Sequence, residues 1–309
     1  MEDLSDPPFR YVCKAYGADL MYTEFISSDG LIRQGAKSVR KLEIFDHERP
    51  IGIQLYGHLV APMAEATRMA EQARPDLIDL NFGCPVKKIA RRGAGAGMLR
   101  DIPLMVEITE AIVQQTRLPV TVKTRLGWDD HHKNIVEVAL RLQDAGIKAL
   151  TIHGRTGTQL YRGEADWGPI GEVKNHPDIE IPIIGNGDVT GPEIAAERFA
   201  RYGVDAIMIG RAAIGRPWIF REIKHYLETG EKLPEPGLTE KISLARMHFQ
   251  RSLEWKGEPR GILEMRRHFS NYFKGLPDFK DIRLKLVTSL HAPEINDILD
   301  MIGEKYTTL

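Results

Sequence analysis

The sequence predicts an α/β protein in which a (β/α)8 TIM barrel is followed by a small C-terminal all-helical domain. Three observations support this prediction. Short apolar runs alternate with amphipathic helical segments over about 190 residues. The runs are continuously apolar, as strands covered on both faces require. A stretch rich in proline, glycine and charged residues then separates this region from a helical tail.

Seven segments are expected to form buried parallel strands, with helical segments such as 134–146 and 192–203 connecting them. A barrel of this type requires eight strands. The first ten residues, MEDLSDPPFR, indicate a loop and a first helix, so we expect the first strand to be missing or to lie upstream of Met1. The expected strands are 18–25, 50–57, 76–83, 119–127, 148–155, 181–188 and 205–211.

A linker is expected around residues 231–242, EKLPEPGLTEKI, because prolines, glycine and charges interrupt the helical pattern there. Helical periodicity then continues to the end of the chain. We therefore predict a barrel domain over residues 1–232 and a helical domain over residues 238–309.

The composition is that of a globular protein, with 42% hydrophobic residues, 28% charged residues and a net charge of −1 in 309 residues. This net charge gives no global affinity for nucleic acid. Cys13 and Cys84 are too few for a disulfide framework or a zinc cluster, so we expect a reducing cytoplasm and no metal. No apolar stretch approaches the roughly 18 residues of a spanning helix, so we expect no membrane partner.

Polar residues follow or end most of the expected strands. The chemistry of a barrel enzyme lies at the carboxyl ends of its strands, and buried charges there cost several kcal/mol unless they are paired. We therefore predict one functional site formed by these residues together. They are Gln54, Asn81, Cys84, Lys123, Arg125, His153, Asn186, Asp188, Gly210 and Arg211.

Each residue also has a plainer interpretation. Cys84 alone is compatible with an inert buried thiol, and Lys123 with a solvent-reaching lysine or the Schiff-base lysine of an aldolase.

The sequences GNGD (185–188) and GR (210–211) are typical of barrel phosphate sites, where glycine lets backbone N–H groups approach an anion. The GAGAG run at 93–97 does not match a dinucleotide-binding pattern, and we expect a flexible segment beside Cys84.

Five motifs in a fixed order give the sequence a family resemblance. They are NFGCP (81–85), VKTRLGW (122–128), TIHGRT (151–156), GNGD (185–188) and GRAAIGRPWIF (210–220). With these motifs, the sequence resembles the tRNA-dihydrouridine synthases, most closely the bacterial B class, over essentially its whole length. The resemblance implies a barrel enzyme that uses FMN, with NADPH or NADH as reductant, to reduce the C5–C6 bond of uridines in tRNA.

The resemblance also implies roles for individual residues. Cys84 is implied as the proton donor, Gln54 and Lys123 as contacts of the flavin ring, and His153 as a neighbour of the flavin. Asn81 and Arg125 are implied near the uracil. The remaining cofactor-binding residues that the resemblance implies are Met1, Glu2, Asn186, Gly187, Asp188, Gly210 and Arg211.

The residue types suit this chemistry independently of the resemblance. Reducing the C5–C6 bond requires a hydride at C6, which reduced flavin can supply, and a proton at C5. A thiol with a pKa of about 8.5 is mostly protonated at neutral pH and can act as a general acid, provided no cation turns it into a thiolate. The four basic residues that follow Cys84 are therefore expected to contact RNA phosphates instead: Lys87, Lys88, Arg91 and Arg92.

The segment from Lys241 to Lys285 carries eleven lysines and arginines against five acidic residues. We predict a tRNA-binding surface there with Arg266 and Arg267 at its centre, the alternative being an ordinary solvated helix face. Phe269, Tyr272 and Phe273 are either stacking platforms for bases or part of the core.

Two other functions fit the same sequence. One is another FMN-dependent barrel oxidoreductase that acts on a free pyrimidine, which leaves the basic helical region without a ligand. The other is an RNA-binding relative without catalytic activity. Bound flavin and turnover of NADPH distinguish these possibilities from a tRNA reductase.

Overall fold

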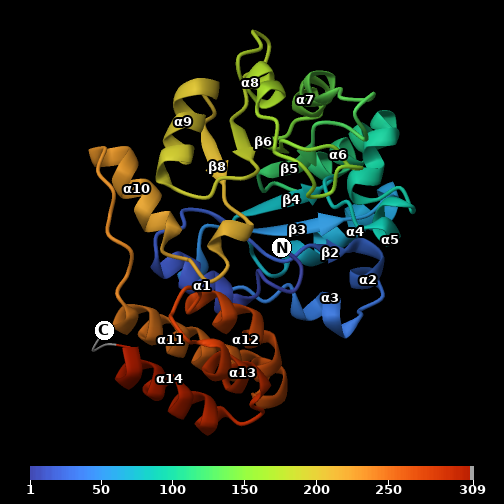
Figure 1. Ribbon diagram of the computed structural model, residues 1–309. Helices are drawn as coiled ribbons and strands as arrows, with labels where there is room; N and C mark the ends of the chain where they lie inside the picture. Colours follow the sequence, from blue (N-terminus) through green and yellow to red (C-terminus); the bar gives the residue numbers. More distant parts are fainter. Residues whose placement is uncertain (307–309) are drawn as a thin grey trace. The chain divides into compact units, whose positions relative to one another are not determined.

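The computed structural model describes residues 1–306 (Figure 1). Its contacts divide into two compact units, and each is interrupted in sequence. The first contains Met1–Ser5 and Leu20–Gly210, and the second contains Asp6–Asp19 and the chain from Arg211 onward. The predicted boundary between 232 and 238 falls in an irregular segment between two helices of the second unit, and the predicted division into domains stays a prediction.

The first unit is built on one parallel sheet whose strands follow the order of the chain, as in a TIM-like barrel. Every pairing in this sheet is parallel, and consecutive strands are neighbours from β3 onward. The strands are β1 (Met21–Tyr22), β2 (Ile26–Ser27), β3 (Ile51–Tyr56), β4 (Leu77–Asn81), β5 (Val120–Arg125), β6 (Ala149–His153), β7 (Ile183–Asn186) and β8 (Ala206–Met208).

The two shortest strands, β1 and β2, are pieces of one edge position, because both pair with β3. Met21 aligns with Ile51, and Ile26 aligns with Leu55 further along β3. The sheet therefore has seven positions, which confirms the seven strands expected from the sequence. Within residues 1–306, no pairing joins β8 back to β1.

Helices cover the outer side of the sheet (Figure 1). Side chains alternate along each strand, so that one face is mainly apolar and includes Ile53, Leu80, Val122 and Ile152, all with no exposed area. The buried Thr124 lies on the same face. This face packs against the crossover helices. The other elements of this unit are α2 (Ser28–Ile32), α3 (Ala36–Arg40), η1 (Asp46–Glu48), α4 (Val60–Glu71), α5 (Lys87–Ala90), η2 (Gly95–Arg100), α6 (Ile102–Gln115), α7 (Ile135–Asp144), α8 (Gly168–Lys174) and α9 (Pro192–Tyr202).

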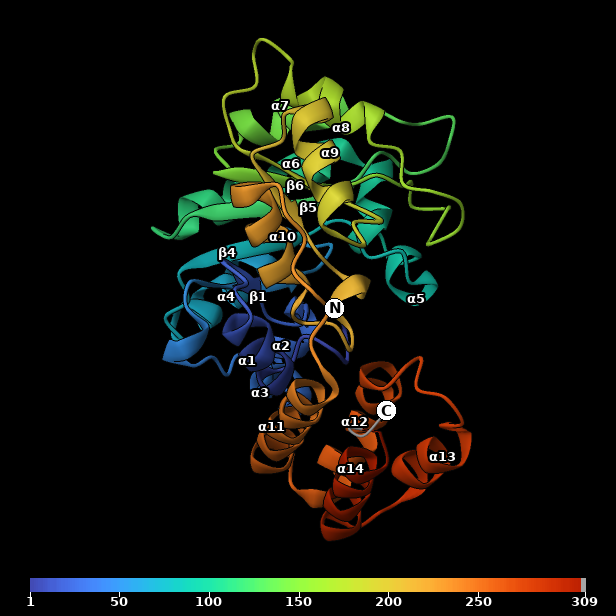
Figure 2. The same ribbon diagram turned by 60° about the vertical axis from the view of Figure 1, so that its left-hand side comes forward.

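The second unit is helical, as the sequence predicts for the C-terminal part (Figure 2). Its core includes Phe249 and Phe269, whose ring centroids are 5.5 Å apart. A buried hydrogen bond of 2.8 Å joins His248 to the Tyr272 hydroxyl. Its elements are α1 (Pro7–Ala15), η3 (Arg211–Ala213), α10 (Ile219–Thr229), α11 (Leu238–Lys256), α12 (Glu258–Tyr272), α13 (Lys280–Thr288) and α14 (Ala292–Tyr306). None of the helices in residues 1–306 has the length and apolar character needed to cross a membrane.

Candidate active site

The strand register brings six of the predicted site residues onto one face of the sheet. Side chains alternate along a strand, so residues aligned in register and two apart share a face. This face is polar, in contrast to the apolar face under the helices, and it ends at the carboxyl ends of the strands, where barrel enzymes place their chemistry. Its three layers are Gln54, Asp79 and Thr121; Asn81, Lys123 and Thr151; and Arg125, His153 and Asn186.

A chain of hydrogen bonds runs through the first two layers toward Cys84. The Gln54 amide donates to Asp79 Oδ2 at 2.6 Å, and Asn81 Nδ2 donates to Gln54 Oε1 at 2.8 Å. Asn81 Oδ1 in turn accepts the backbone N–H groups of Gly83 and Cys84, at 3.1 and 2.9 Å. A buried carboxylate thus orients both amide side chains and, through them, the backbone at Cys84.

Asp79, at the base of this chain, was not predicted as a site residue. It has no exposed area, and burial raises its pKa to about 6 against the opposing hydrogen bonds from Thr121, at 2.5 Å, and Gln54. The sequence carries a signal for it, since Asp79 is the one acid inside the apolar run LIDLN. An acid in such a run requires buried partners.

Lys123 is the cation of the second layer. Its side chain forms no hydrogen bond and no ion pair within residues 1–306. Burial of its ammonium, followed by repulsion from Arg125, lowers its pKa to about 8, with Asp79 partly opposing this shift. A desolvated cation without a partner favours an anionic or electron-rich ligand on this face.

Arg125 holds together the loops that follow β4 and β6. Its Nε donates to the carbonyl of Gly83 at 2.7 Å, and its Nη1 donates to the carbonyls of Thr156 and Leu160 at 2.8 and 2.9 Å. Nη2 has no hydrogen bond within the described chain. The guanidinium therefore fixes the two loops and keeps one nitrogen available for a ligand.

Cys84 lies in the loop after β4, with a side chain that is 8% exposed. Burial raises the pKa of its thiol, opposed by the backbone N–H of Val86 and by Arg125. The charges that act most strongly on the sulfur are Arg125, Glu2 and Lys123. The thiol therefore stays protonated at neutral pH, as a proton donor requires.

The glycine-rich segment after Cys84 is packed rather than open. Residues 95–99 are buried in η2, and the N–H of Ala96 donates to the carbonyl of Cys84 at 2.9 Å. Gly95 has a φ of +55°, and a Cβ there would lie 2.6 Å from the Cys84 carbonyl oxygen. The expectation of a flexible segment is wrong because close backbone packing explains these glycines.

Arg155, a buried residue that is also absent from the predicted site, links His153 of the third layer to Asp188. Its guanidinium pairs with both carboxylate oxygens of Asp188, at 3.0 and 2.6 Å, and contacts His153 Nε2 at 3.3 Å. Asp188 accepts a third bond, from the N–H of Ala165. Asp188 therefore braces the loop after β7, in which Gly187 has a φ of +128°. Asn186, the last residue of β7, donates to the Met208 carbonyl.

The remaining predicted cofactor residues lie at the chain start and after β8. Met1 is close to Gly210, since a Cβ at Gly210 would lie 3.7 Å from the Met1 sulfur. Both oxygens of Glu2 accept hydrogen bonds from Lys41 at 2.6 Å. Arg211 begins η3 with an exposed side chain and belongs to the second compact unit.

Comparison with protein families shows to which family the chain belongs. The model of the family described as Dihydrouridine synthase (Dus) matches residues 1–300 of the chain. The chain belongs to the dihydrouridine synthase family.

Curated relatives agree with this family. The tRNA-dihydrouridine synthase B of Pseudomonas aeruginosa is 40% identical over 283 residues, which cover 92% of this chain and 85% of the relative. A protein of Rickettsia conorii named probable tRNA-dihydrouridine synthase is 38% identical over 310 residues, covering 100% of this chain and 92% of the relative. Both relatives therefore match nearly the full length of this chain.

Solved structures support the fold of this family member. Histamine dehydrogenase from Rhizobium sp. 4-9 matches with a TM-score of 0.53 at 12% identity, over 80% of this chain and 46% of that chain. A complex of 2-naphthoyl-CoA reductase matches with a TM-score of 0.54 at 11% identity, over 73% of this chain and 47% of that chain. The chain spans about half the length of these proteins, and they show a shared fold.

Dihydrouridine synthase family membership implies a flavin, and the residues on the polar face fit one. The unpaired Lys123 ammonium suits the electron-rich edge of a flavin ring. Gly187 and Gly210 carry no side chain, a feature that favours close approach of a phosphate to backbone N–H groups. These residue types match the two ends of a flavin mononucleotide.

The two basic regions predicted for this dihydrouridine synthase, 87–92 and 241–285, differ in the exposure of their side chains. The four cations on α5 and directly after it, Lys87, Lys88, Arg91 and Arg92, are exposed. By contrast, Phe269, Tyr272 and Phe273 are at most 1% exposed. Of the two alternatives for these aromatic residues, the structure supports the core and excludes stacking platforms, because amphipathic packing of α12 buries them. Arg266 is half-buried and donates to the Thr288 carbonyl at 3.4 Å, while Arg267 is exposed.

Proposed function

We propose that this protein reduces specific uridines of tRNA to 5,6-dihydrouridine, with FMN as cofactor and NADPH or NADH as reductant. Membership in the dihydrouridine synthase family supports the reaction. The observation that carries the proposal is the polar face on which an unpaired Lys123 and the loop of a protonated Cys84 meet. Together they provide a place for an electron-rich ring and a proton donor beside it.

The cofactor is proposed to lie along the polar face. When bound, the flavin supplies the hydride for C6 of the uracil. Lys123 stabilises negative charge at the ring edge with its ammonium, and Gln54 contacts the ring with the N–H that Asp79 does not use. The proposed neighbours of its phosphate end and of the ring are Met1, Glu2, His153, Asn186, Gly187, Asp188, Gly210 and Arg211.

Cys84 is proposed to donate the proton to C5. Its raised pKa keeps the proton on sulfur at neutral pH, and the backbone bond to Asn81 holds the loop in place. Asn81 and Arg125 are proposed to contact the uracil, Arg125 through the free Nη2. After the transfer, the thiolate regains a proton from solvent.

Binding of the whole tRNA is proposed to involve both predicted domains. Residues 1–232 act as the flavin-binding catalytic domain, and residues 238–309 act as the tRNA-binding domain with Arg266 and Arg267. We place the reaction in the cytoplasm, because a tRNA-modifying enzyme works where its substrate is.

One experiment tests the proposal and its alternatives together. The purified protein is analysed for released flavin and then incubated with NADPH and unmodified tRNA, and dihydrouridine is measured by mass spectrometry. We expect FMN to be released and dihydrouridine to form. Flavin with reduction of a free pyrimidine only indicates a small-molecule oxidoreductase, and tRNA binding without flavin indicates a non-catalytic RNA-binding relative. Release of adenine dinucleotide alone contradicts the cofactor assignment.

A further inference from the structure

Five of the eleven cations of the basic segment 241–285 have acidic partners in the second unit. These five contribute little attraction for a phosphate, because a carboxylate already compensates their charge. Arg266 donates to the neutral Thr288 carbonyl instead, which leaves its charge uncompensated. The pairs are Lys241 with Glu235, Arg246 with Asp300, Arg251 with Glu254, Lys256 with Asp6 and Glu264, and Arg260 with Glu264.

Four cations of this segment differ from the rest. Lys274, Lys280, Arg283 and Lys285 are exposed, and their side chains form no hydrogen bond and no ion pair with any residue in 1–306. All four lie after α12 or on α13. Most of the uncompensated positive charge of the segment is therefore carried by its C-terminal part, from Lys274 to Lys285.

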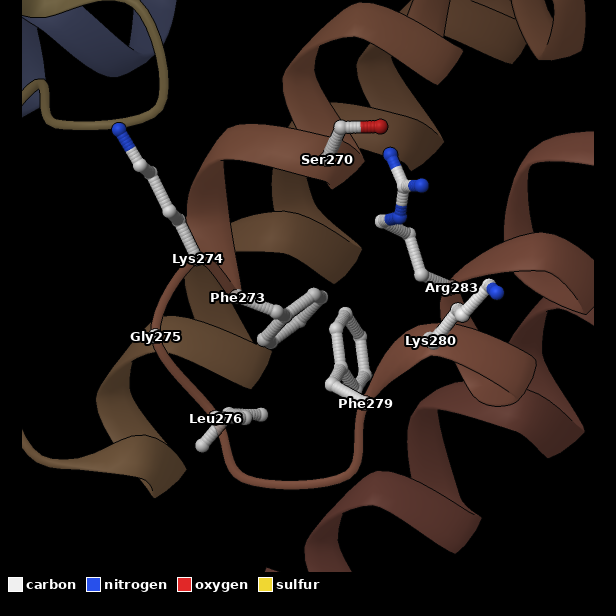
Figure 3. A pocket seen from close by; sticks show the side chains of 8 residues that line it. All are labelled: Ser270, Phe273, Lys274, Gly275, Leu276, Phe279, Lys280 and Arg283. Carbon is white, nitrogen blue, oxygen red and sulfur yellow. The ribbon is translucent and has the colours of Figure 1, made fainter.

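Three of these cations line one cavity (Figure 3). The cavity has a volume of about 360 Å³, at the lower end of the roughly 300–1,000 Å³ typical of ligand sites. Figure 3 shows the Arg283 guanidinium directed toward the Ser270 hydroxyl, with the rings of Phe273 and Phe279 facing each other nearby. Lys280 lies on the same side of the rings as Arg283, whereas the Lys274 side chain points away from both.

We propose that this cavity binds a phosphate group of the tRNA backbone through Arg283 and Lys280. The proposal rests on the proposed function, which supplies the tRNA. A guanidinium and an ammonium group on neighbouring long side chains suit the oxygens of an exposed phosphodiester. Asp278 and Asp281 belong to the same stretch, but neither lines the cavity or forms an ion pair with these cations.

The cavity recognises the backbone and not a base. Phe273 and Phe279 are only 1% and 7% exposed, and their rings contact each other at a centroid distance of 5.9 Å, so neither face is free for stacking. A phosphate contact fixes the position of an RNA without reading its sequence. Loss of the cavity cations therefore weakens binding of different tRNAs by the same factor.

The test measures tRNA affinity by filter binding over a range of salt concentrations. Lys280→Ala/Arg283→Ala removes both proposed contacts. Each phosphate contact contributes about fivefold at about 0.15 M salt, so affinity falls about 25-fold and the log-log salt slope falls by roughly 1.4 to 1.8. Arg283→Lys, which keeps the charge, restores most of the affinity.

Lys285→Ala is the matched control, because Lys285 is an exposed, unpaired cation on the same helix that does not line the cavity. We expect its affinity and salt slope to stay within twofold of the unaltered protein. Equal losses from Lys285→Ala and Arg283→Ala overturn the cavity as a site, as does unchanged affinity of the double variant. Failure of the unaltered protein to bind any tRNA overturns the proposed function and the cavity assignment with it.

Discussion

Cys84 combines three properties of a proton donor in one residue. Its thiol stays protonated because burial raises its pKa, its backbone is fixed by Asn81, and its loop follows the polar face directly. We expect Cys84→Ala to bind flavin and to be reduced by NADPH as before, while dihydrouridine formation falls by roughly 100-fold or more, the usual effect of a positioned acid. Flavin absorbance and mass spectrometry of tRNA measure the two results.

Cys13 is the control for this substitution. It is a second buried thiol, on α1, and burial also raises its pKa. Cys13→Ala should leave tRNA reduction unchanged. If Cys84→Ala also reduces tRNA at the normal rate, Cys84 is an inert core thiol.

Asp79 is predicted to keep a larger fraction of Lys123 charged, by partly opposing the burial and the Arg125 charge that lower the Lys123 pKa. Lys123 is charged below its folded pKa of about 8 and neutral above it, so flavin affinity should weaken as pH rises through about 8. Asp79→Asn keeps the size of the side chain but removes a carboxylate that raises the Lys123 pKa. The midpoint of the flavin-binding curve should therefore move to lower pH, as fluorescence titration across pH 6 to about 9 can measure.

Thr121→Val provides the comparison for Asp79→Asn. It removes a hydrogen bond to Asp79 and leaves the carboxylate in place. Its binding midpoint should stay near pH 8. Identical pH profiles for Asp79→Asn and the unaltered protein contradict the electrostatic role of Asp79.

At the scale of elements, the segment from β4 through α5 to η2 holds Cys84 by backbone contacts. Gly95→Ala introduces a Cβ 2.6 Å from the Cys84 carbonyl oxygen and places alanine at a φ of +55°. The left-handed conformation alone costs about 1 kcal/mol. We expect the rate of tRNA reduction to fall by much more than this loss of stability explains. The variant should still bind flavin.

Gly230→Ala is the control that distinguishes the cost of a left-handed backbone from a displacement of Cys84. Gly230 has a φ of +75° at the end of α10, and nothing lies within 4 Å of the position of an added Cβ. Gly230→Ala should lower the melting temperature by a similar amount and leave tRNA reduction unchanged. Equal activities of the two variants mean that Gly95 does not position Cys84.

At the scale of the whole molecule, charge is balanced overall but uneven along the chain. The net charge is −1, yet no acidic residue lies between Asp79 and Asp101. Within residues 1–306, the side chains of Lys87, Lys88, Arg91 and Arg92 form no hydrogen bond or ion pair. Arg100 anchors this helix by donating to the Ala90 carbonyl at 2.8 Å. These cations are therefore presented to solvent on a fixed backbone beside Cys84.

This distribution predicts that α5 contacts phosphates near the target uridine. Lys87→Ala/Lys88→Ala should lower the log-log salt slope of tRNA binding by roughly 1.4 to 1.8. Arg117→Ala/Lys148→Ala removes two exposed cations at the amino ends of β5 and β6, the other end of the strands, and should leave the slope unchanged. The same loss in both double variants indicates nonspecific attraction, and α5 then has no local role.

Much of the fold was determined by the sequence itself. The alternation of apolar runs and helical segments predicted seven parallel strands, and the motifs around Cys84, Lys123 and His153 indicated the family. These features depend on residues close together in the chain, whose spacing decides which element forms and which side chains share a face. The placement of six predicted site residues on one face follows from the same periodicity.

Only the tertiary structure decided which charged and polar side chains have partners. Asp79 reaches Gln54 across 25 positions of sequence, and Arg155 reaches Asp188 across 33. Such pairs depend on strand register and loop packing, which sum many weak contacts across the whole fold. For the same reason, the sequence could not show that Phe273 is core or that Arg283 is unpaired. Local spacing determines the elements, whereas the balance of charge and burial at each residue is set by neighbours that only the folded chain brings together.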